Sequence, residues 1–291
     1  MRSVACVVSS VLLAAALAGC ASAPTKVAGD APPTLAFAPE RQRPVGEELA
    51  PQVAMLRPDQ LPIPVGGLAG RTIRVERISD IRLGPREIVL TFDDGPMPGK
   101  TEKILRALDD YGVKATFLMV GQMANAYPAI ARKVAERGHT VGTHTQNHSN
   151  LASLGSDRAM AQILAGQNSV AAALKPAGLR PAPFFRFPYL AETAALRANL
   201  AARNVVVIDA DIDSKDYFKT GSEPLRARAL SRITERGSGI VLFHDIHART
   251  VSMLPGLLAD LKARGYKVVH LVPARGGGGL LIAGAPAEPP A

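Results

Sequence analysis

The sequence predicts an α/β fold, a distorted (β/α) barrel of about seven parallel strands in a single domain. The first observation is a regular alternation of short apolar runs with helical patterns, which is typical of a parallel sheet with helices outside. The second is the number of strand candidates, about seven in roughly 200 residues, which suits a barrel slightly smaller than the eightfold one. A doubly wound open sheet is the alternative, and no G-x-G-x-x-G motif after the first strand supports nucleotide binding.

The expected strands are short runs of mainly apolar residues, a composition typical of strands buried on both faces. In chain order they are residues 87–92, 113–118, a strand near 140, and residues 184–187, 205–209, 240–243 and 268–271. The first strand is followed by Gly95-Pro96, a turn signal that separates it from the next helix.

The expected helices lie between these strands, where apolar residues recur at a helical period. They are residues 101–111, near 127–137, near 157–174 and around 252–264. Because helices alternate with strands along the chain, we expect them to cover the outside of the sheet.

Both ends of the chain differ in composition from this central region. Residues 1–19 begin with Arg2 and an uncharged apolar run, shorter than the roughly 20 residues that span a bilayer, and are typical of a secretory signal. The sequence Leu-Ala-Gly-Cys that ends at Cys20 resembles the lipobox of bacterial lipoproteins, which implies cleavage before Cys20 and its lipid modification. The alternative is an ordinary signal peptide cleaved near residues 21–23.

The predicted organisation has four parts. They are a lipoprotein signal peptide at 1–19, a Pro-rich spacer at 20–75, a catalytic domain at 76–273 and a Gly/Pro-rich tail at 274–291. Proline at the density found in the spacer blocks helix and sheet, so the spacer would hold the domain away from a membrane. We expect an exported lipoprotein, facing the periplasm or at the outer membrane, attached through a lipid anchor at Cys20.

The overall composition excludes several kinds of protein. Aromatic residues make up 4% of the chain and Trp is absent, which argues against a sugar-binding module built on stacked aromatic platforms. Two cysteines are too few for a disulfide framework or a Cys-rich zinc site. The formal charge of +9 would suit an acidic polymer, but the chain lacks the aromatic interleaving of single-stranded nucleic-acid binders. Since export is also predicted, we expect no nucleic-acid partner.

Ionisable side chains interrupt this scaffold where the predicted strands end. They are Asp93, Asp94, His144, His148, Arg186 and His244. In a parallel barrel the C-terminal ends of the strands form one rim, and active sites are built there. The sequence therefore predicts that these side chains converge on one site.

The spacing of two of them suggests a metal ion. His144 and His148 are four residues apart, so they would share one face of a helix or helical turn. A carboxylate from Asp93 or Asp94 would complete an Asp-His-His set, since Gly95-Pro96 supplies a turn that lets both reach one site. Three protein ligands leave positions open for water and substrate, which is a catalytic arrangement. In isolation, Asp-Asp-Gly-Pro is also the composition of a solvated turn.

Five short motifs follow one another along the chain. They are Thr91-Phe92-Asp93-Asp94-Gly95-Pro96, His144–His148, Arg186-Phe187-Pro188-Tyr189, Asp213-Ser214-Lys215-Asp216-Tyr217 and Leu242-Phe243-His244, which Asp245-Ile246-His247 continues. In sequence and in order they resemble the motifs of the polysaccharide deacetylases, carbohydrate esterase family four. They span about residues 88–269 and neither end of the chain. The family usually has Trp where Tyr217 stands, which puts the shape of the acetyl pocket and the substrate range in question.

This resemblance implies an activity and a cofactor. Asp94, His144 and His148 would hold one divalent metal, usually zinc, with cobalt or nickel also accepted. The metal would polarise the acetyl carbonyl of an N-acetylated sugar polymer and lower the pKa of a bound water. The expected substrate is an N-acetylglucosamine-containing polysaccharide such as peptidoglycan or an exopolysaccharide.

The resemblance also implies proton-transfer roles. Asp93 would take the proton of the attacking water, and His244 would protonate the departing amine. Arg186 would orient Asp93 and favour its ionised form, since a nearby cation stabilises a carboxylate. Asp216 would hold the ring of His244 and favour its protonated form.

The same resemblance assigns residues to the oxyanion and substrate pocket. The backbone N–H of Tyr189, which follows Pro188, would stabilise the charge that develops on the carbonyl oxygen. Tyr217 and Leu242 would form the wall of the pocket for the acetyl methyl group.

Three histidines outside these assignments remain. We expect His139 and His270 to be structural, and leave His247 open. Two other functions also remain open at this stage: a deacetylase-like protein that binds glycan without turnover, and a related hydrolase of small amides or O-acetyl esters.

Overall fold

The computed structural model describes residues 67–274 of the 291-residue chain. The strands are β1 (Ala69–Val75), β2 (Glu87–Asp93), β3 (Thr116–Met119), β4 (Thr140–Thr143), β5 (Phe184–Phe185), β6 (Val206–Val207), β7 (Ile212–Asp213), β8 (Gly239–His244) and β9 (Lys267–Pro273). The α-helices are α1 (Thr101–Asp110), α2 (Gly121–Ala126), α3 (Pro128–Glu136), α4 (Ser156–Leu174), α5 (Ala194–Ala202), α6 (Ser222–Arg236) and α7 (Ala248–Ala263). The predicted signal peptide, Cys20 and the tail beyond 274 lie outside the described residues.

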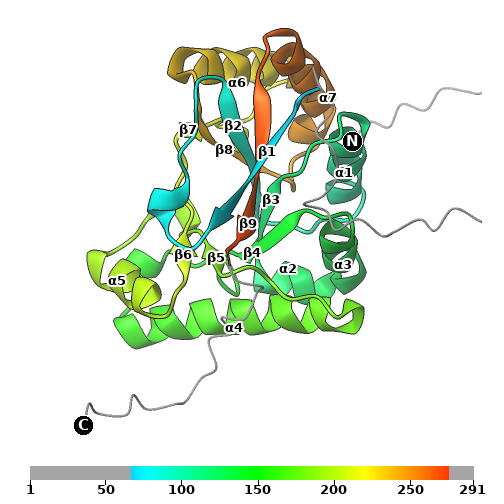
Figure 1. Cartoon of the computed structure of the whole chain (residues 1–291). Helices are drawn as coiled ribbons and strands as arrows, with labels where there is room; N and C mark the ends of the chain where they lie inside the picture. Colours follow the sequence, from blue (N-terminus) through cyan, green and yellow to red (C-terminus); the bar gives the residue numbers. More distant parts are fainter. Residues whose placement is uncertain (1–66, 275–291) are drawn as a thin grey trace, which may run out of the picture. The chain divides into compact units, whose positions relative to one another are not determined.

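All strand pairings in the described region are parallel, and they run in the order β1-β9-β2-β3-β4-β5-β6, with β8 pairing β2 and β7 pairing β8. The helices lie outside the strands (Figure 1). Within residues 67–274 no pairing joins β6 to β7, so the barrel has an open seam there. The predicted distorted (β/α) barrel is confirmed, and the open seam and the three pairing partners of β2 are its irregular features.

Strand β2 is the centre of the sheet. Its residues 88–93 pair with residues 239–244 of β8, and residues 91–93 pair with residues 116–118 of β3. Every residue of β2 after Glu87 is buried, which explains why its sequence is a continuous apolar run up to Thr91 and Asp93. Because β2 and β8 are in register and parallel, Asp93 and His244 are direct partners at the ends of the two strands.

Two apolar layers hold the strands in place. One lies between the sheet and the outer helices, where Ile104, Leu105 and Leu108 of α1 pack under β2 and β3. The other fills the barrel interior, with Val89, Phe184 and other inward-facing residues. Both layers support the strand ends that carry the ionisable side chains, so the site rests on a close-packed scaffold.

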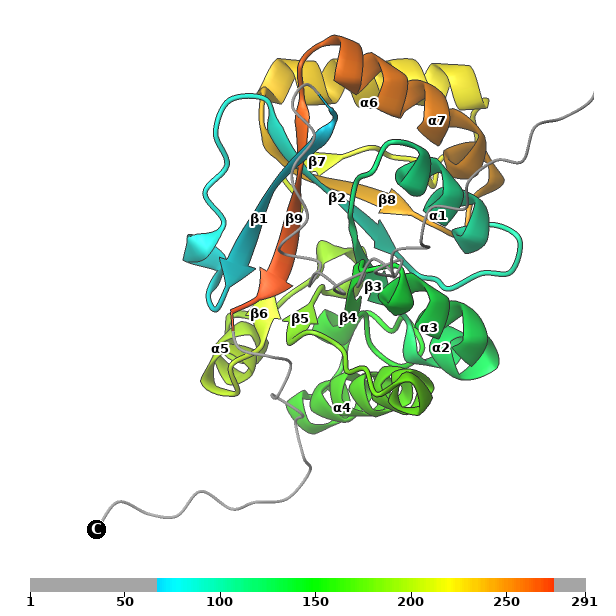
Figure 2. The ribbon, with the colours of Figure 1, turned by 45° about the vertical axis from the view of Figure 1, so that its right-hand side comes forward.

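Strand β1 is a difference from the sequence-based expectation. Residues 69–75 are the last part of the predicted spacer, but they form a strand that pairs with β9. Ala69 pairs with Val268, which in turn pairs with Ile88 near the start of β2. In Figures 1 and 2, β1 and β9 lie side by side.

Several elements were not predicted, and each has a weak sequence signal. Helix α6 is rich in arginine, and it buries only Leu225, Ala229 and Ile233. It packs beside α7 (Figure 2), where Arg226 makes two hydrogen bonds to Asp260. The two-residue strand β7 is too short to show a period, and α2 and α5 are short helices.

The histidines expected to be structural lie away from the strand ends described below. The His139 Nδ1 atom accepts a hydrogen bond from the Ala115 N–H, and its ring packs edge-on against Phe117. The His270 Nε2 atom lies 3.0 Å from the Thr140 hydroxyl oxygen. Burial lowers the pKa of His139 to about 3 and that of His270 to about 4, so both rings are neutral at physiological pH.

Among residues 67–274, no helix combines the length and apolar character needed to cross a bilayer.

Candidate active site

A pocket of about 480 Å³ lies at the C-terminal ends of β2, β4, β5, β7 and β8. It is lined by Asp93, Asp94, His144, His148, Phe187, Tyr189, Leu190, Asp213, Tyr217, Leu242, His244, Ile246 and His247. Most of the residues predicted for the site therefore meet in one cavity. Arg186 and Asp216 lie behind its wall, where each bonds to a lining residue.

Arg186 is a fully buried guanidinium at the end of β5. Its Nη1 atom donates to the Asp93 Oδ1 atom and the Thr91 hydroxyl, both at 2.8 Å. Its Nε and Nη2 atoms donate to the backbone oxygens of Ile208 (2.9 Å) and Asp209 (3.0 Å). The residue is only 1% exposed, so these four bonds supply the partners that a buried cation needs. They also fix the orientation of the Asp93 carboxylate.

The Asp93 carboxyl group is 1% exposed, and its pKa is raised. Burial is the main cause, since it removes water from the charged form; the charges of Arg186 and His244 oppose it. Arg186 therefore favours the ionised form as expected, but burial outweighs it. A carboxylate with a raised pKa is a stronger base than an ordinary aspartate, and proton transfer to it becomes more favourable.

Asp94, His144 and His148 bring one oxygen and two nitrogen atoms together. The Asp94 Oδ1 atom lies 3.3 Å from the His148 Nε2 atom and 3.6 Å from the His144 Nε2 atom. That oxygen is buried and has no hydrogen-bond partner within residues 67–274. The His144 Nδ1 atom lies 2.8 Å from the Arg186 carbonyl oxygen, which orients the ring with Nε2 toward Asp94.

This set fits a divalent metal ion. The three ligand atoms lie within 4.8 Å of one another. Burial lowers the pKa of His144 to about 3, so the ring is in the neutral form that binds metal. A metal would also give the buried Asp94 Oδ1 atom the partner that it lacks. Three protein ligands of this chemistry match a catalytic site with open positions.

The segment from His144 to His148 is a turn, and the expected helix or helical turn is not present. Thr145 (φ 67°) and His148 (φ 60°) are in the left-handed region, and the His148 N–H donates to the Thr145 hydroxyl at 3.0 Å. The two rings still meet, with centroids 5.0 Å apart. The two histidines therefore lie together, as the spacing predicts, but a turn brings them together instead of a helix.

His244 and Asp216 form a second polar pair at the pocket. The His244 Nδ1 atom lies 2.6 Å from the Asp216 Oδ1 atom. The Asp216 Oδ2 atom accepts hydrogen bonds from the His244 backbone N–H (2.8 Å) and the Thr250 hydroxyl (2.6 Å). Burial alone would lower the pKa of His244, but the bond to Asp216 and its charge outweigh this and raise the pKa to about 9. At neutral pH the ring is therefore protonated and can act as an acid.

Of the residues expected to form the oxyanion and acetyl pockets, some line the cavity and one does not. Tyr189 lines the pocket in the left-handed region (φ 60°), and its backbone N–H has no acceptor among the described residues. Pro188 is buried at the start of the same turn and does not line the pocket. The Tyr217 hydroxyl donates to the Asp213 Oδ2 atom at 2.9 Å, and Leu242 lies beside Asp213 in the pocket wall.

Asp245 was noted in the sequence only as part of a motif. Its carboxylate is buried against the backbone of Gly95, and its Oδ2 atom accepts a 2.6 Å hydrogen bond from the Thr101 hydroxyl. The Thr101 hydroxyl in turn accepts from the Met97 N–H at 2.7 Å. These contacts tie the loop that carries Asp94 to α1 and to the end of β8. The sequence signal for Asp245 was its position directly after His244 in the fifth motif. No sequence signal indicated Thr101 or Thr250.

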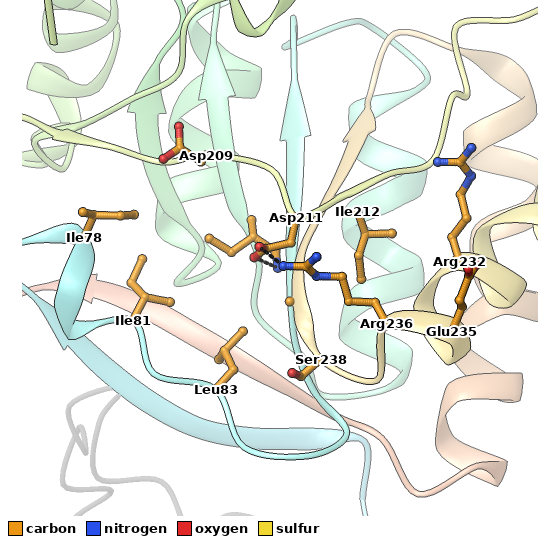
Figure 3. A pocket seen from close by; sticks show the side chains of 12 residues that line it. Ile78, Ile81, Leu83, Asp209, Asp211, Ile212, Arg232, Glu235, Arg236 and Ser238 are labelled. Carbon is orange, nitrogen blue, oxygen red and sulfur yellow. Dashed lines mark hydrogen bonds and ion pairs between the residues drawn. The ribbon is translucent and has the colours of Figure 1, made fainter. Parts of the chain in front are cut away.

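A second cavity, of about 980 Å³, lies apart from these residues (Figure 3). It opens beside the starting ends of β7 and β8, where Ile81 and Leu83 face an ion pair between Asp211 and Arg236. None of the residues predicted for the site lines it. The pocket at the C-terminal strand ends is therefore the one with converging catalytic groups.

Comparison with known proteins gives one consistent result. The family described as "Polysaccharide deacetylase" matches residues 80–208. A chitin deacetylase of Colletotrichum lindemuthianum is 33% identical over 197 residues, which cover 64% of this chain and 77% of that protein. A peptidoglycan-N-acetylglucosamine deacetylase of Listeria monocytogenes is 30% identical over 202 residues, which cover 69% of this chain and 41% of the relative.

Among solved structures, the chain also resembles a peptidoglycan deacetylase. The Bdellovibrio bacteriovorus peptidoglycan deacetylase Bd3279 is 35% identical, with a TM-score of 0.62 over 72% of this chain and 57% of that one. The chain therefore spans less than two thirds of the length of the Listeria and Bdellovibrio proteins. The family match at residues 80–208 includes Asp93, Asp94, His144, His148 and Arg186 of the pocket region.

Proposed function

The chain belongs to the polysaccharide deacetylase family, and on that premise we propose that it is a metal-dependent N-deacetylase of N-acetylglucosamine-containing polysaccharide. The observation that carries the proposal is the contrast between two groups in one pocket. Asp93 is a buried carboxylate held by Arg186, and His244 is an imidazole kept protonated by Asp216. A base and an acid side by side, next to a metal-ligand set, are what amide hydrolysis requires.

Asp94, His144 and His148 would hold the metal ion, which we propose to be zinc, with cobalt or nickel as substitutes. When bound, such an ion supplies Lewis-acid polarisation of a carbonyl group and makes a coordinated water more acidic. The Arg186 carbonyl oxygen holds the His144 ring in place, a type of outer contact that tunes metal affinity.

The protein side chains divide the proton transfers between them. Asp93 accepts a proton from the water that attacks the acetyl carbonyl carbon. The Tyr189 N–H, which has no acceptor among residues 67–274, would donate to the oxygen on which charge develops. His244 then gives a proton to the nitrogen of the departing sugar amine, leaving acetate and a free amine as products. Arg186 and Asp216 act through Asp93 and His244 as positioning residues.

The substrate proposal rests on the shape of the pocket and on the relatives. Tyr189, which is 67% exposed, and Tyr217, which is 43% exposed, stand at its edge, as expected for a site that admits part of a long polymer. The Listeria relative is named for peptidoglycan N-acetylglucosamine and the Colletotrichum one for chitin. We propose peptidoglycan as the substrate, with another N-acetylglucosamine polymer as the second candidate.

Acetate release from purified peptidoglycan and from chitooligosaccharides tests the activity. The zinc-loaded protein should release acetate, and Asp93→Asn should release almost none while keeping its fold by circular dichroism. No release from either polymer would overturn the proposal. Glycan binding without acetate would support the non-catalytic alternative, and faster hydrolysis of acetylxylan would support an O-acetyl esterase.

We also propose that the chain is exported and anchored through lipid on Cys20, because Leu-Ala-Gly-Cys follows an apolar run at the N-terminus. Metabolic labelling with a radioactive fatty acid tests this. Label in the wild-type chain that is absent from Cys20→Ala is the expected result. Equal recovery of both proteins in the soluble fraction would contradict the anchor.

A further inference from the structure

His247 is a pocket residue that the proposed reaction does not use. It lies three residues after His244, directly before α7, and lines the same cavity. Its ring contacts the His244 ring, with centroids 5.7 Å apart, and neither of its nitrogen atoms has a hydrogen-bond partner among residues 67–274. Burial lowers the pKa of His247, so the ring is neutral and has a lone pair available.

His247 completes a second set of potential metal ligands. One ligand atom each from Asp216, His244 and His247 lie within 4.8 Å of one another. This set shares no residue with Asp94, His144 and His148, the other group of this kind in the described region. One carboxylate and two imidazoles are ligands that zinc accepts, and both histidines border the open pocket.

We propose that Asp216, His244 and His247 form a second zinc site, and that zinc bound there switches the enzyme off. The inhibition rests on the proposed function, because it requires His244 to be the acid of the reaction. The binding of a second ion does not rest on it. The two claims can therefore be tested separately.

The Asp216 carboxylate is oriented for this role. Its Oδ2 atom is occupied by the His244 N–H and the Thr250 hydroxyl, so only Oδ1 faces the imidazole. The Oδ1 and Nδ1 atoms are 2.6 Å apart, whereas two ligands of a tetrahedral zinc stand roughly 3.3 Å apart. The His244 ring therefore has to move by less than about 1 Å, and the ligand atom of His247, within 4.8 Å of the other two, has to approach by at most about 1.5 Å.

Zinc binding at this place removes the proton that the reaction needs. The ion takes the position of the hydrogen between the His244 Nδ1 atom and Asp216, and one proton leaves to solvent. What remains is a neutral imidazole that keeps only its Nε2–H. Such a group is far too weak an acid to protonate an amine leaving group, so turnover stops while substrate can still enter.

The first experiment counts ions. The full chain is stripped with a chelator and dialysed against buffered free zinc, and bound zinc is measured by mass spectrometry. We expect two equivalents for the wild type, one for His247→Asn, and two for His247→Cys, since a thiolate replaces the lost ligand. One equivalent in the wild type, or two in His247→Asn, would overturn the proposal.

The second experiment measures acetate release against free zinc. The wild type should be active with one equivalent bound, and should lose about tenfold in rate when free zinc is ten times the dissociation constant of the second equivalent. His247→Asn should keep its rate at high zinc, and His247→Cys should again be inhibited. Magnesium at the same concentrations is the control for ionic strength, because it prefers oxygen ligands.

These readouts also separate the proposal from other roles of His247. If His247 only contacted the sugar, His247→Asn would raise KM and bind as many zinc ions as the wild type, which would overturn the role of His247 as a ligand. If the chain had no deacetylase activity, the ion count would still decide whether the second site exists. Inhibition of His247→Asn equal to that of the wild type would refute its part in the switch.

Discussion

At the scale of single residues, the proposed base and the proposed acid of the pocket both have raised pKa values, for opposite reasons. Asp93 is raised because burial disfavours its charge, and His244 is raised because Asp216 favours its charge. The result is a stronger base and a persistently protonated acid in one cavity. This pairing divides the two proton transfers without any other titratable group.

The role of Asp93 predicts a large loss on its removal. Asp93→Asn should lower kcat by about 10²–10⁴-fold, the usual contribution of a general base, because an amide cannot accept the proton. Zinc content should stay unchanged, since the metal set consists of Asp94, His144 and His148. Steady-state acetate release and metal analysis give both values. Asp209→Asn, at an exposed carboxylate outside the pocket, is the control, and a loss under tenfold for Asp93→Asn would exclude its role as base.

The pKa of His244 predicts the alkaline side of the pH profile. Its protonated form is the active one, so kcat/KM should fall as pH rises through the folded-state pKa of about 9. Asp216→Asn removes the charge that raises this pKa, and the fall should then begin at a lower pH. Rates measured between pH 6 and about 10.5 test this. An alkaline limb that is identical in both proteins would assign it to another group.

At the scale of elements, the loop between β2 and α1 positions the proposed metal ligand. Asp94 is in the left-handed region (φ 79°), and Gly95 follows it against the buried Asp245 carboxylate. A methyl group at residue 95 would overlap that carboxylate. The loop can therefore hold Asp94 in place only with glycine at this position.

Gly95→Ala should displace this loop. We expect zinc affinity to fall at least tenfold and the free energy of unfolding to fall by about 1–3 kcal/mol, the usual cost of overpacking a tight site. Chelator competition and urea unfolding measure the two effects. Gly84→Ala is the matched control, because its new methyl group meets only Glu87 at 3.5 Å, and should change stability by less than about 0.5 kcal/mol. Unchanged zinc affinity in Gly95→Ala would show that the loop tolerates the shift.

At this scale, the strands differ in how accurately the sequence predicts them. Strands β2 and β8 were predicted within a residue or two, because both are buried on each face and their apolar runs are continuous. Strand β1 fell within the spacer predicted from proline density, and its residues Arg71, Thr72 and Arg74 leave it without a continuous apolar run. Its formation depends on pairing with β9, about 200 residues later, which no local pattern records.

At the scale of the whole molecule, the convergence of the site could be predicted and its electrostatics could not. Parallel strands bring their C-terminal ends together, so Asp93, His144, Arg186 and His244 had to meet once the fold was known. The buried bonds of Asp216 to Thr250 and of Asp245 to Thr101 join residues far apart in the sequence. The same holds for the effect of burial on Asp93, because burial is a property of the packed molecule.

Metal binding should stabilise the whole domain. The buried Asp94 Oδ1 atom has no hydrogen-bond partner in the described part of the chain, and a bound ion would supply one. At free zinc about 100 times the dissociation constant, mass action stabilises the folded state by about 2.7 kcal/mol, which corresponds to roughly 5–11 °C in Tm for a domain of this size. Scanning calorimetry with chelator, and then with zinc restored, measures the shift. His148→Asn should show a much smaller shift, and an equal shift would place the ion elsewhere.

The pairing of β1 with β9 fixes the end of the barrel at which the described region begins. Gly67 accepts a hydrogen bond from the side chain of Lys267, next to the starting ends of β9 and β2. The catalytic groups stand at the opposite end of β2, about 20 Å away along the strand. Residue 67, where the described region begins, therefore lies at the end of the barrel opposite the mouth of the pocket. The first described residues leave the approach of a long polymer to the catalytic groups unobstructed.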